Sequence, residues 1–307
     1  ISPSSLVNHK VITSTYSNSI AARRGNASQT TITKYKDTAE SILIDQTKIT
    51  TSLFDTLGNP IDTITEISVK SGNDLLVTNK ILTHNAGYDN RGDAQNQEVT
   101  TYQVDYVNGS RTDTLIKFEL FTNRVFDASH NVVNQRILTY DQKGGSLLDA
   151  SEVRSIGYHS TGVALKQIIA TYATESSTIP LEVKVIENSN ISSQGNIGTT
   201  VITKYSGATI AASGTGDITP TGAISKDTFT NLSFDDRGNA ITQTLLKETF
   251  KDGSFSFSEA KSITNSSFDI HDRTLASIVK NYSSFDYAAK TPLGFLDMQG
   301  TGYNNYD

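Results

Sequence analysis

The sequence lacks cysteine and tryptophan and holds one methionine, Met298, and five prolines among its 307 residues. Without thiols the chain can form neither disulfides nor thiolate metal sites, and it needs no reducing compartment. No run of about 18 apolar residues is present, so the sequence predicts no membrane-spanning helix. The net charge is −6 and no basic patch occurs, which argues against a nucleic-acid partner.

Apolar material is also scarce. Hydrophobic residues make up 36% of the chain and aromatic residues 8%. A thin, extended structure needs less apolar material than a compact enzyme of this length, so the composition favours the former. The abundance of Ser, Thr, Asn and Gly, with few oxidisable side chains, is typical of extracellular bacterial surface proteins. Because the chain starts with Ile1, we expect a processed or excised segment of a longer protein.

A short turn motif recurs along the whole chain. Its form is Phe/Tyr-Asp-x-x-Gly-Asn or Asp at residues 54–59, 88–93 and 234–239, with drifted copies at 126–131 and 268–273. Aligning these and weaker copies places a turn residue at Gly25, Gly58, Gly92, His130, Gly162, Gly195, Gly238 and Asp272. The interval is about 34 residues, and a Gly/Ser/Thr/Ala-rich loop insertion, 206–225, explains the longest one. The sequence therefore predicts one elongated array of about eight repeats over 1–307.

Other positions keep a fixed distance from the turn. Ten residues after it lies a tyrosine column: Tyr35, Tyr102, Tyr140, Tyr172, Tyr205 and Tyr282. Seven residues after it lies a mainly aliphatic column, and we expect Ile137, Ile169 and Ile202 there to be buried on equivalent residues one repeat away. Nine residues before the turn lies another apolar column, which includes Ile49, Phe121 and Ile186.

These patterns predict strands joined by tight turns. Glycine and asparagine tolerate positive φ, so the glycines at 25, 58, 92, 162, 195 and 238 are expected to be structural turn residues. Second turn signals lie midway through repeats, at Asn108-Gly109, Gly144-Gly145, Ser206-Gly207 and Asp252-Gly253. The segments between them are rich in Thr, Ile, Val, Tyr and Phe. We found no helix-capping pattern followed by an apolar stripe.

The predicted fold is therefore all-β: tandem two-strand hairpins that form a continuous coiled antiparallel sheet, a solenoid or an elongated shell. An outer-membrane barrel is the main rival architecture. A lipid-facing strand needs one uniformly apolar face. The expected strand 94–102 carries polar residues on both faces, at Gln95 through Glu98, which argues against a barrel.

The Phe/Tyr-Asp-x-x-Gly element resembles the YD or RHS repeats of bacterial surface and toxin proteins. Residues 54–59, 88–93 and 234–239 carry this resemblance. It implies a spiralling β-sheet shell and a location at the cell wall or envelope. The repeat here is longer than in that family, and no toxin or protease segment is visible.

The sequence offers no catalytic or cofactor-binding motif, and we expect a non-enzymatic protein without a firm metal site. Arg91-Gly92-Asp93 is an integrin-type tripeptide, but equivalent turns read Arg-Gly-Asn, which favours a plain turn. Weak calcium binding is conceivable at Asp89, Asp93, Asp235 and Asp236, against the alternative that turn aspartates accept backbone N–H bonds. The tyrosine column either packs across strands or contacts sugars.

The first functional hypothesis is a structural segment of an extracellular bacterial surface fibre, sheath or adhesin stalk. The alternatives are a carbohydrate-binding adhesin and a phage-tail-like polysaccharide-processing protein. The expected partners are further repeats or copies of the chain joined end to end, with surface glycans as a second possibility. Residues 302–307 resemble the approach to a turn at 87–90, so we expect the array to continue beyond this segment.

Overall fold

A computed structural model describes residues 8–210 and 216–302. The strands are β1 (His9–Thr15), β2 (Gln29–Tyr35), β3 (Leu43–Phe54), β4 (Pro60–Ser71), β5 (Asp74–Tyr88), β6 (Ala94–Val107), β7 (Ser110–Phe126), β8 (Val132–Tyr140), β9 (Leu147–Tyr158), β10 (Ala164–Tyr172), β11 (Glu182–Ile191), β12 (Ile197–Ile210), β13 (Ile218–Phe234), β14 (Ala240–Lys251), β15 (Ser254–Phe268), β16 (Thr274–Asp286) and β17 (Thr291–Gly302). One short helix, α1 (Ser19–Arg24), follows β1.

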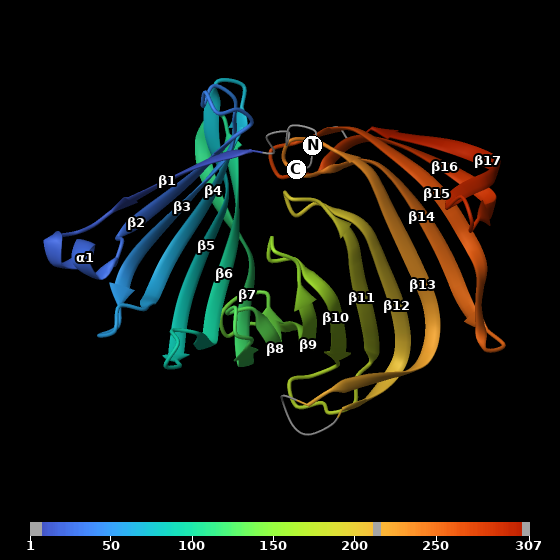
Figure 1. Ribbon diagram of the computed structural model, residues 1–307, viewed down its shortest axis with the longest axis horizontal. Coiled ribbons are helices and arrows are strands. Elements are labelled where there is room, and N and C mark those ends of the chain that lie inside the picture. The colour runs from blue at the N-terminus through green and yellow to red at the C-terminus, as the bar shows by residue number, and fades with distance from the viewer. Residues whose placement is uncertain (1–7, 211–215, 303–307) are drawn as a thin grey trace, which may run out of the picture. The chain divides into compact units, whose positions relative to one another are not determined.

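Two compact halves divide the chain, residues 1–152 and 153–307, and the boundary falls within β9. In the first half, β1 to β8 pair antiparallel with their neighbours in chain order. In the second half, β10 to β17 do the same (Figure 1). The prediction of an all-β antiparallel hairpin fold is confirmed, because neighbouring strands alternate in direction throughout each half. No helix among the described residues is long and apolar enough to span a membrane.

The connection between β1 and β2 contains the short helix α1, for which the sequence showed no capping pattern followed by an apolar stripe. Asn18 caps α1 by accepting hydrogen bonds from the backbone N–H groups of Ile20 and Ala21. Gly25 ends the helix with φ 74°, a left-handed C-terminal cap. The helix was missed because it buries none of its residues, so it has no apolar stripe to reveal it.

The turn column has one conformation along the chain. All eight predicted turn residues have positive φ, including the two that are not glycine, His130 and Asp272. Seven connections, from 55–59 to 269–273, are five residues long and share two backbone hydrogen bonds. In the turn at Gly58, the N–H of Asp55 donates to the carbonyl of Asn59, and the N–H of Gly58 donates to the carbonyl of Asp55.

A β-bulge marks the tyrosine column. In six repeats the strand register shifts between the ninth and tenth residues after the turn, at Tyr35, Ser68, Tyr102, Tyr205, Glu248 and Tyr282. A bulge inserts one extra residue in one strand and increases local twist. The period of the sequence is therefore also a period of bulges, which adds twist at the same position of successive hairpins.

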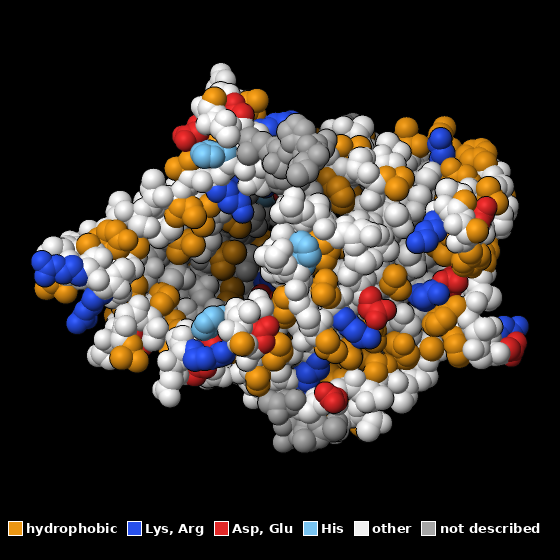
Figure 2. Space-filling view, in the orientation of Figure 1, with side chains coloured by type: hydrophobic (Ala, Val, Ile, Leu, Met, Phe, Trp, Pro, Cys, Tyr) orange, Lys and Arg blue, Asp and Glu red, His pale blue; other side chains and the backbone are white. Residues whose placement is uncertain are grey.

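Few side chains are deeply buried. The largest fully buried side chains are those of Val104 and Val183. On the face seen in Figure 2, hydrophobic side chains lie among polar ones instead of forming one continuous patch. Such dispersed burial is expected of a sheet whose two faces are both partly open to solvent.

Two expectations about the strands are wrong. Ile137, Ile169 and Ile202 are half-buried, not buried. They do not stack on equivalents one repeat away: Ile137 lies opposite Phe121, and Ile202 opposite Ile186, within the hairpin around one turn. The physical reason lies in the hairpin. Its turn brings the residue nine positions before the turn opposite the residue seven positions after it, so each aliphatic side chain pairs within its own hairpin.

The segment 206–225 is also not a loop in its described part. Residues 206–210 extend β12 and residues 218–225 extend β13, with Gly207 opposite Thr221 and Ile210 opposite Ile218. Thus Ser206-Gly207 is strand, not turn. Thr and Ile inside the segment favour pairing despite its glycines. Residues 211–215, also part of the expected loop, lie outside the described residues.

Candidate functional site

Each turn aspartate stabilises its own turn. Asp55 Oδ1 accepts the backbone N–H groups of Leu57, at 2.9 Å, and Asn59, at 2.8 Å. The same contacts recur at Asp89, Asp127, Asp235 and Asp269. In the turn at Gly195 the hydroxyl of Ser192 replaces the carboxylate, accepting from Gln194 at 3.2 Å and Asn196 at 3.1 Å. In the turn at Gly162, His159 Nδ1 accepts from the N–H of Thr161 at 3.3 Å. The turn therefore uses a side-chain acceptor at this position, and neither a carboxylate nor a charge is required.

Successive turns also contact one another. A Cβ added to Gly58 would lie 2.7 Å from Oδ1 of Asn26, and one added to Gly238 would lie 2.8 Å from Oδ1 of Asn196. Asn239 Nδ2 donates to Asp272 Oδ1 at 2.7 Å. In each case the residue after one turn touches the turn position of the next repeat. Glycine at these positions thus allows both the positive φ and the close approach of the neighbouring turn.

Arginines add a second link between turns. Arg91 Nη1 donates to the carbonyl of Asp127 at 2.8 Å, and Arg237 Nη2 donates to the carbonyl of Asp269 at 2.7 Å. Both arginines precede their turn glycine, and both acceptors lie at the start of the next turn. The two halves of the molecule therefore use the same side-chain-to-backbone link.

An asparagine column, which the sequence reading missed, joins adjacent hairpins. Seven residues before the turn, Asn85, Asn188, Asn231 and Asn265 donate to a backbone carbonyl of the preceding repeat. The acceptors lie two residues after the preceding turn, as for Asn231 and Ile197 at 2.9 Å. The signal was present in the sequence as a recurring Asn at this offset.

The structure places the predicted site residues inside these turns. Asp93 of the Arg-Gly-Asp tripeptide has a side chain only 7% exposed, held by Arg91 Nη2 at 2.7 Å and by His130 Nδ1 at 2.7 Å. This carboxylate is engaged within the protein, which disfavours integrin binding. Asp89 and Asp235, two calcium candidates, accept backbone N–H groups. Asp236 adjoins Asp235, and among the described residues no three acidic or histidine side chains converge as metal ligands.

The tyrosine column packs across strands. Tyr140 lies opposite Phe118 with ring centroids 6.2 Å apart, and Tyr282 lies opposite Phe295 at 6.1 Å. Lys80 lies over the ring of Tyr102. Tyr172 is buried, and Tyr35 and Tyr205 are half-buried. These contacts favour packing across strands over an open ladder for sugars.

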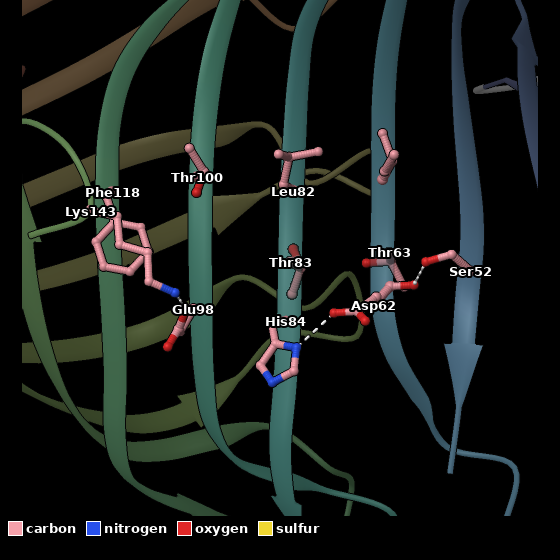
Figure 3. A pocket seen from close by; sticks show the side chains of 11 residues that line it. Ser52, Asp62, Thr63, Leu82, Thr83, His84, Glu98, Thr100, Phe118 and Lys143 are labelled. Carbon is pink, nitrogen blue, oxygen red and sulfur yellow. Dashed lines mark hydrogen bonds and ion pairs between the residues drawn. The ribbon is translucent and has the colours of Figure 1, made fainter.

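A different row of side chains gathers charge in the first half. Asp62 on β4, His84 on β5 and Glu98 on β6 lie directly opposite one another across three strands. His84 Nδ1 lies 2.6 Å from Asp62 Oδ1, and Lys143 Nζ, from the loop after β8, lies 2.6 Å from Glu98 Oε2 (Figure 3). Opposite residues on paired strands are neighbours on one face of the sheet, so we refer to these four side chains as the charged row.

A shallow cavity of about 290 Å³ adjoins the charged row. Its other walls include Ile64. They also include Leu82, Thr100 and Phe118, which are labelled in Figure 3. Phe118 is only 3% exposed, and the ammonium of Lys143 lies 5.6 Å from the centre of its ring. Ser52 donates to the backbone carbonyl of Asp62 and not to His84, so the three do not form a nucleophilic triad.

The charged row breaks the repeat. His84 and Glu98 lie eight residues before and six residues after their turn. The same offsets hold Thr50 and Ile64, Thr122 and Arg136, Glu187 and Val201, Thr230 and Thr244, and Thr264 and Ile278. None of these five pairs joins two ionisable side chains. The sequence reading overlooked this exception because these two offsets were not compared between repeats.

No protein-family model matches the chain, and no curated protein matches it. Among solved structures, it is similar to a porin-like protein from Bacteroides uniformis, with 9% identity. That match covers 83% of this chain and 95% of the other, with a TM-score of 0.22.

Proposed function

We propose that this chain is a structural, non-catalytic segment of an extracellular bacterial surface fibre, sheath or adhesin stalk. One observation carries the proposal: within each half, most turns contact the next turn through the same positions. The Asn or Asp after a turn meets the following turn residue at Gly58, Gly92 and His130 in the first half and at Gly238 and Asp272 in the second. Four asparagines of the Asn column join their hairpin to the preceding repeat. Repeats that interact only with their neighbours can be added in series.

The finer architecture that we propose is a continuous coiled sheet. The recurring bulges support it, because each adds twist at an equivalent position of successive hairpins. The YD/RHS-like turn motif is consistent with the same arrangement and with a cell-surface location.

Further repeats or copies of the chain are the proposed partners. Strand β17 pairs with β16, and its Leu293, Phe295, Leu296 and Met298 are each 48–61% exposed. An apolar strand at a sheet edge invites pairing with another strand. We propose that another repeat covers β17 and continues the sheet.

Small-angle scattering and light scattering across a concentration series test this proposal. We expect an elongated particle that grows in length with concentration. Leu296→Lys, which places a charge on the exposed edge strand, is expected to reduce this growth. The matched control is Leu57→Lys, in an exposed turn, which is expected to leave it unchanged. A compact monomer of constant size at all concentrations would contradict the proposal.

A further inference from the structure

The charged row has no counterpart at the same offsets of the other paired strands, and its chemistry goes beyond what a structural array requires. Exposed ion pairs contribute little to stability, and the side chains of His84 and Asp62 are 50% and 42% exposed. In the repeat around Gly238, the positions that correspond to His84 and Glu98 are occupied by Thr230 and Thr244. Stability therefore gives no reason for the exception, whereas ligand recognition does.

We propose that the cavity beside His84 binds a single pyranose ring of a glycan. Asp62 and Glu98 each use one carboxylate oxygen for a protein partner, His84 or Lys143. The second oxygens and His84 Nε2 have no protein hydrogen bond among the described residues. A hydroxyl group both donates and accepts, so neighbouring hydroxyls of a sugar fit this mixture of carboxylates, imidazole and ammonium.

The charges of the site disfavour an anion. Two carboxylates, Asp62 and Glu98, and one ammonium, Lys143, adjoin the cavity, and Glu98 is paired with Lys143 at 2.6 Å. Asp62 is hydrogen-bonded to the His84 imidazole, so it already has a partner on the protein. A divalent metal fits poorly, because no three ligand side chains converge anywhere in the described part of the chain.

The shape of the cavity points to one ring. Its volume of about 290 Å³ is at the small end of ligand sites, which suits a monosaccharide unit and not a long buried chain. The side chains of Ile64 and Leu82 line the same space and can contact the C–H face of a pyranose. Charged, hydroxyl-bearing and aliphatic side chains thus meet in one open cavity, from which the rest of a polymer can extend into solvent.

Amide-resolved NMR titration with methyl β-D-glucopyranoside and N-acetyl-D-glucosamine tests the proposal. We expect saturable shifts of residues on β4 to β7 with at least one of the two. Glycerol at the same concentration is the control for weak additive binding. The proposal is overturned if neither sugar produces saturable shifts on β4 to β7, or if glycerol produces the same shifts.

The repeat supplies a substitution that spares the fold. The double variant His84→Thr, Glu98→Thr copies the pair Thr230 and Thr244, and we expect at least about a tenfold loss of affinity. Glu98→Gln, a smaller change, should weaken binding even if the double variant unfolds. Glu187→Gln alters the residue at the same offset as His84 in another repeat, and it should leave sugar affinity unchanged. Unaltered affinity in both His84 and Glu98 variants contradicts the proposal, and it leaves the array function untouched because assembly is measured separately.

Discussion

The two ends of the hairpins are built differently. At one end, seven connections from 55–59 to 269–273 are five residues long and share one hydrogen-bonding pattern. At the opposite end the connections vary, from two-residue turns at 72–73, 108–109 and 252–253 to the loop 173–181. The extension of β12 and β13 also lies at this opposite end.

This difference shows where neighbouring repeats set their mutual register. The constant end carries the contacts between turns and the hydrogen bonds of the Asn column. The variable end accepts insertions because the longer interval between Gly195 and Gly238 leaves both turns in the same conformation. If the two ends differ in this way, four changes to the chain should have graded effects on stability.

The largest difference in stability is expected between two variants that carry a Gly-Ser insertion, one in a constant turn and one in a variable connection. Between Leu57 and Gly58 the insertion separates Asp55 from Asn59, whose backbone N–H and side-chain amide donate to the Asp55 carboxylate and whose carbonyl accepts from the Asp55 N–H. The loss of about three hydrogen bonds should cost about 3 kcal/mol of unfolding free energy. Between Asn108 and Gly109, doubling the connection should cost about 0.6 kcal/mol. Urea unfolding of the two variants measures the contrast, and equal losses would remove the distinction between the ends.

Valine in place of a turn glycine should be the next most damaging change. Gly238 and Gly253 have φ of 96° and 83°, but only at Gly238 does an added Cβ meet a neighbouring turn, at Asn196. We expect Gly238→Val to cost about 2 kcal/mol and Gly253→Val about 1 kcal/mol. Thermal and urea unfolding give the values. Similar losses would show that backbone strain alone, without the contact between turns, sets the cost.

Removal of one link of the Asn column should have a smaller effect. Asn231→Ala leaves the Ile197 carbonyl without its side-chain donor, at an expected cost of about 1.5 kcal/mol. Asn281→Ala removes a side-chain hydrogen bond to Asp297 and leaves no backbone carbonyl without a donor, so it should cost less than about 0.5 kcal/mol. Denaturant midpoints distinguish the two, and an Asn231 variant as stable as the Asn281 variant would exclude the column as a joint between hairpins.

The sequence predicted the periodic features because each has a local cause. Positive φ at Gly58 and Gly238 follows from the chemistry of the turn, and strand character follows from the β-branched residues between turns. The helix α1 was missed because none of its residues is buried, so its sequence has no apolar stripe. The half-burial of Ile169 and the cross-strand row of Asp62, His84 and Glu98 depend on which strands pair and in which register. That register includes a bulge in most hairpins, and the turn motif alone does not determine it.

The smallest expected effect distinguishes a turn that carries an aspartate from the turn that carries Ser192, and it is expected only at acidic pH. The side-chain amide of Asn131, followed by its backbone N–H, holds the pKa of Asp127 below its ordinary value, and the backbone N–H of Asp93 does the same for Asp89. A carboxylate whose pKa is lower in the folded state adds stability above its unfolded pKa of about 3.9 and loses it as the pH falls through the folded value. Stability should therefore decline below about pH 4, and only modestly, because these groups are exposed.

The variant Asp127→Ser tests this expectation. It places at this turn the hydroxyl that Ser192 uses at another, so the turn keeps an acceptor that does not titrate. Urea unfolding measured from neutral pH down to about pH 3 should show a shallower decline for Asp127→Ser than for the wild type. An identical decline would mean that the Asp127 carboxylate contributes no more in its charged form than a hydroxyl does.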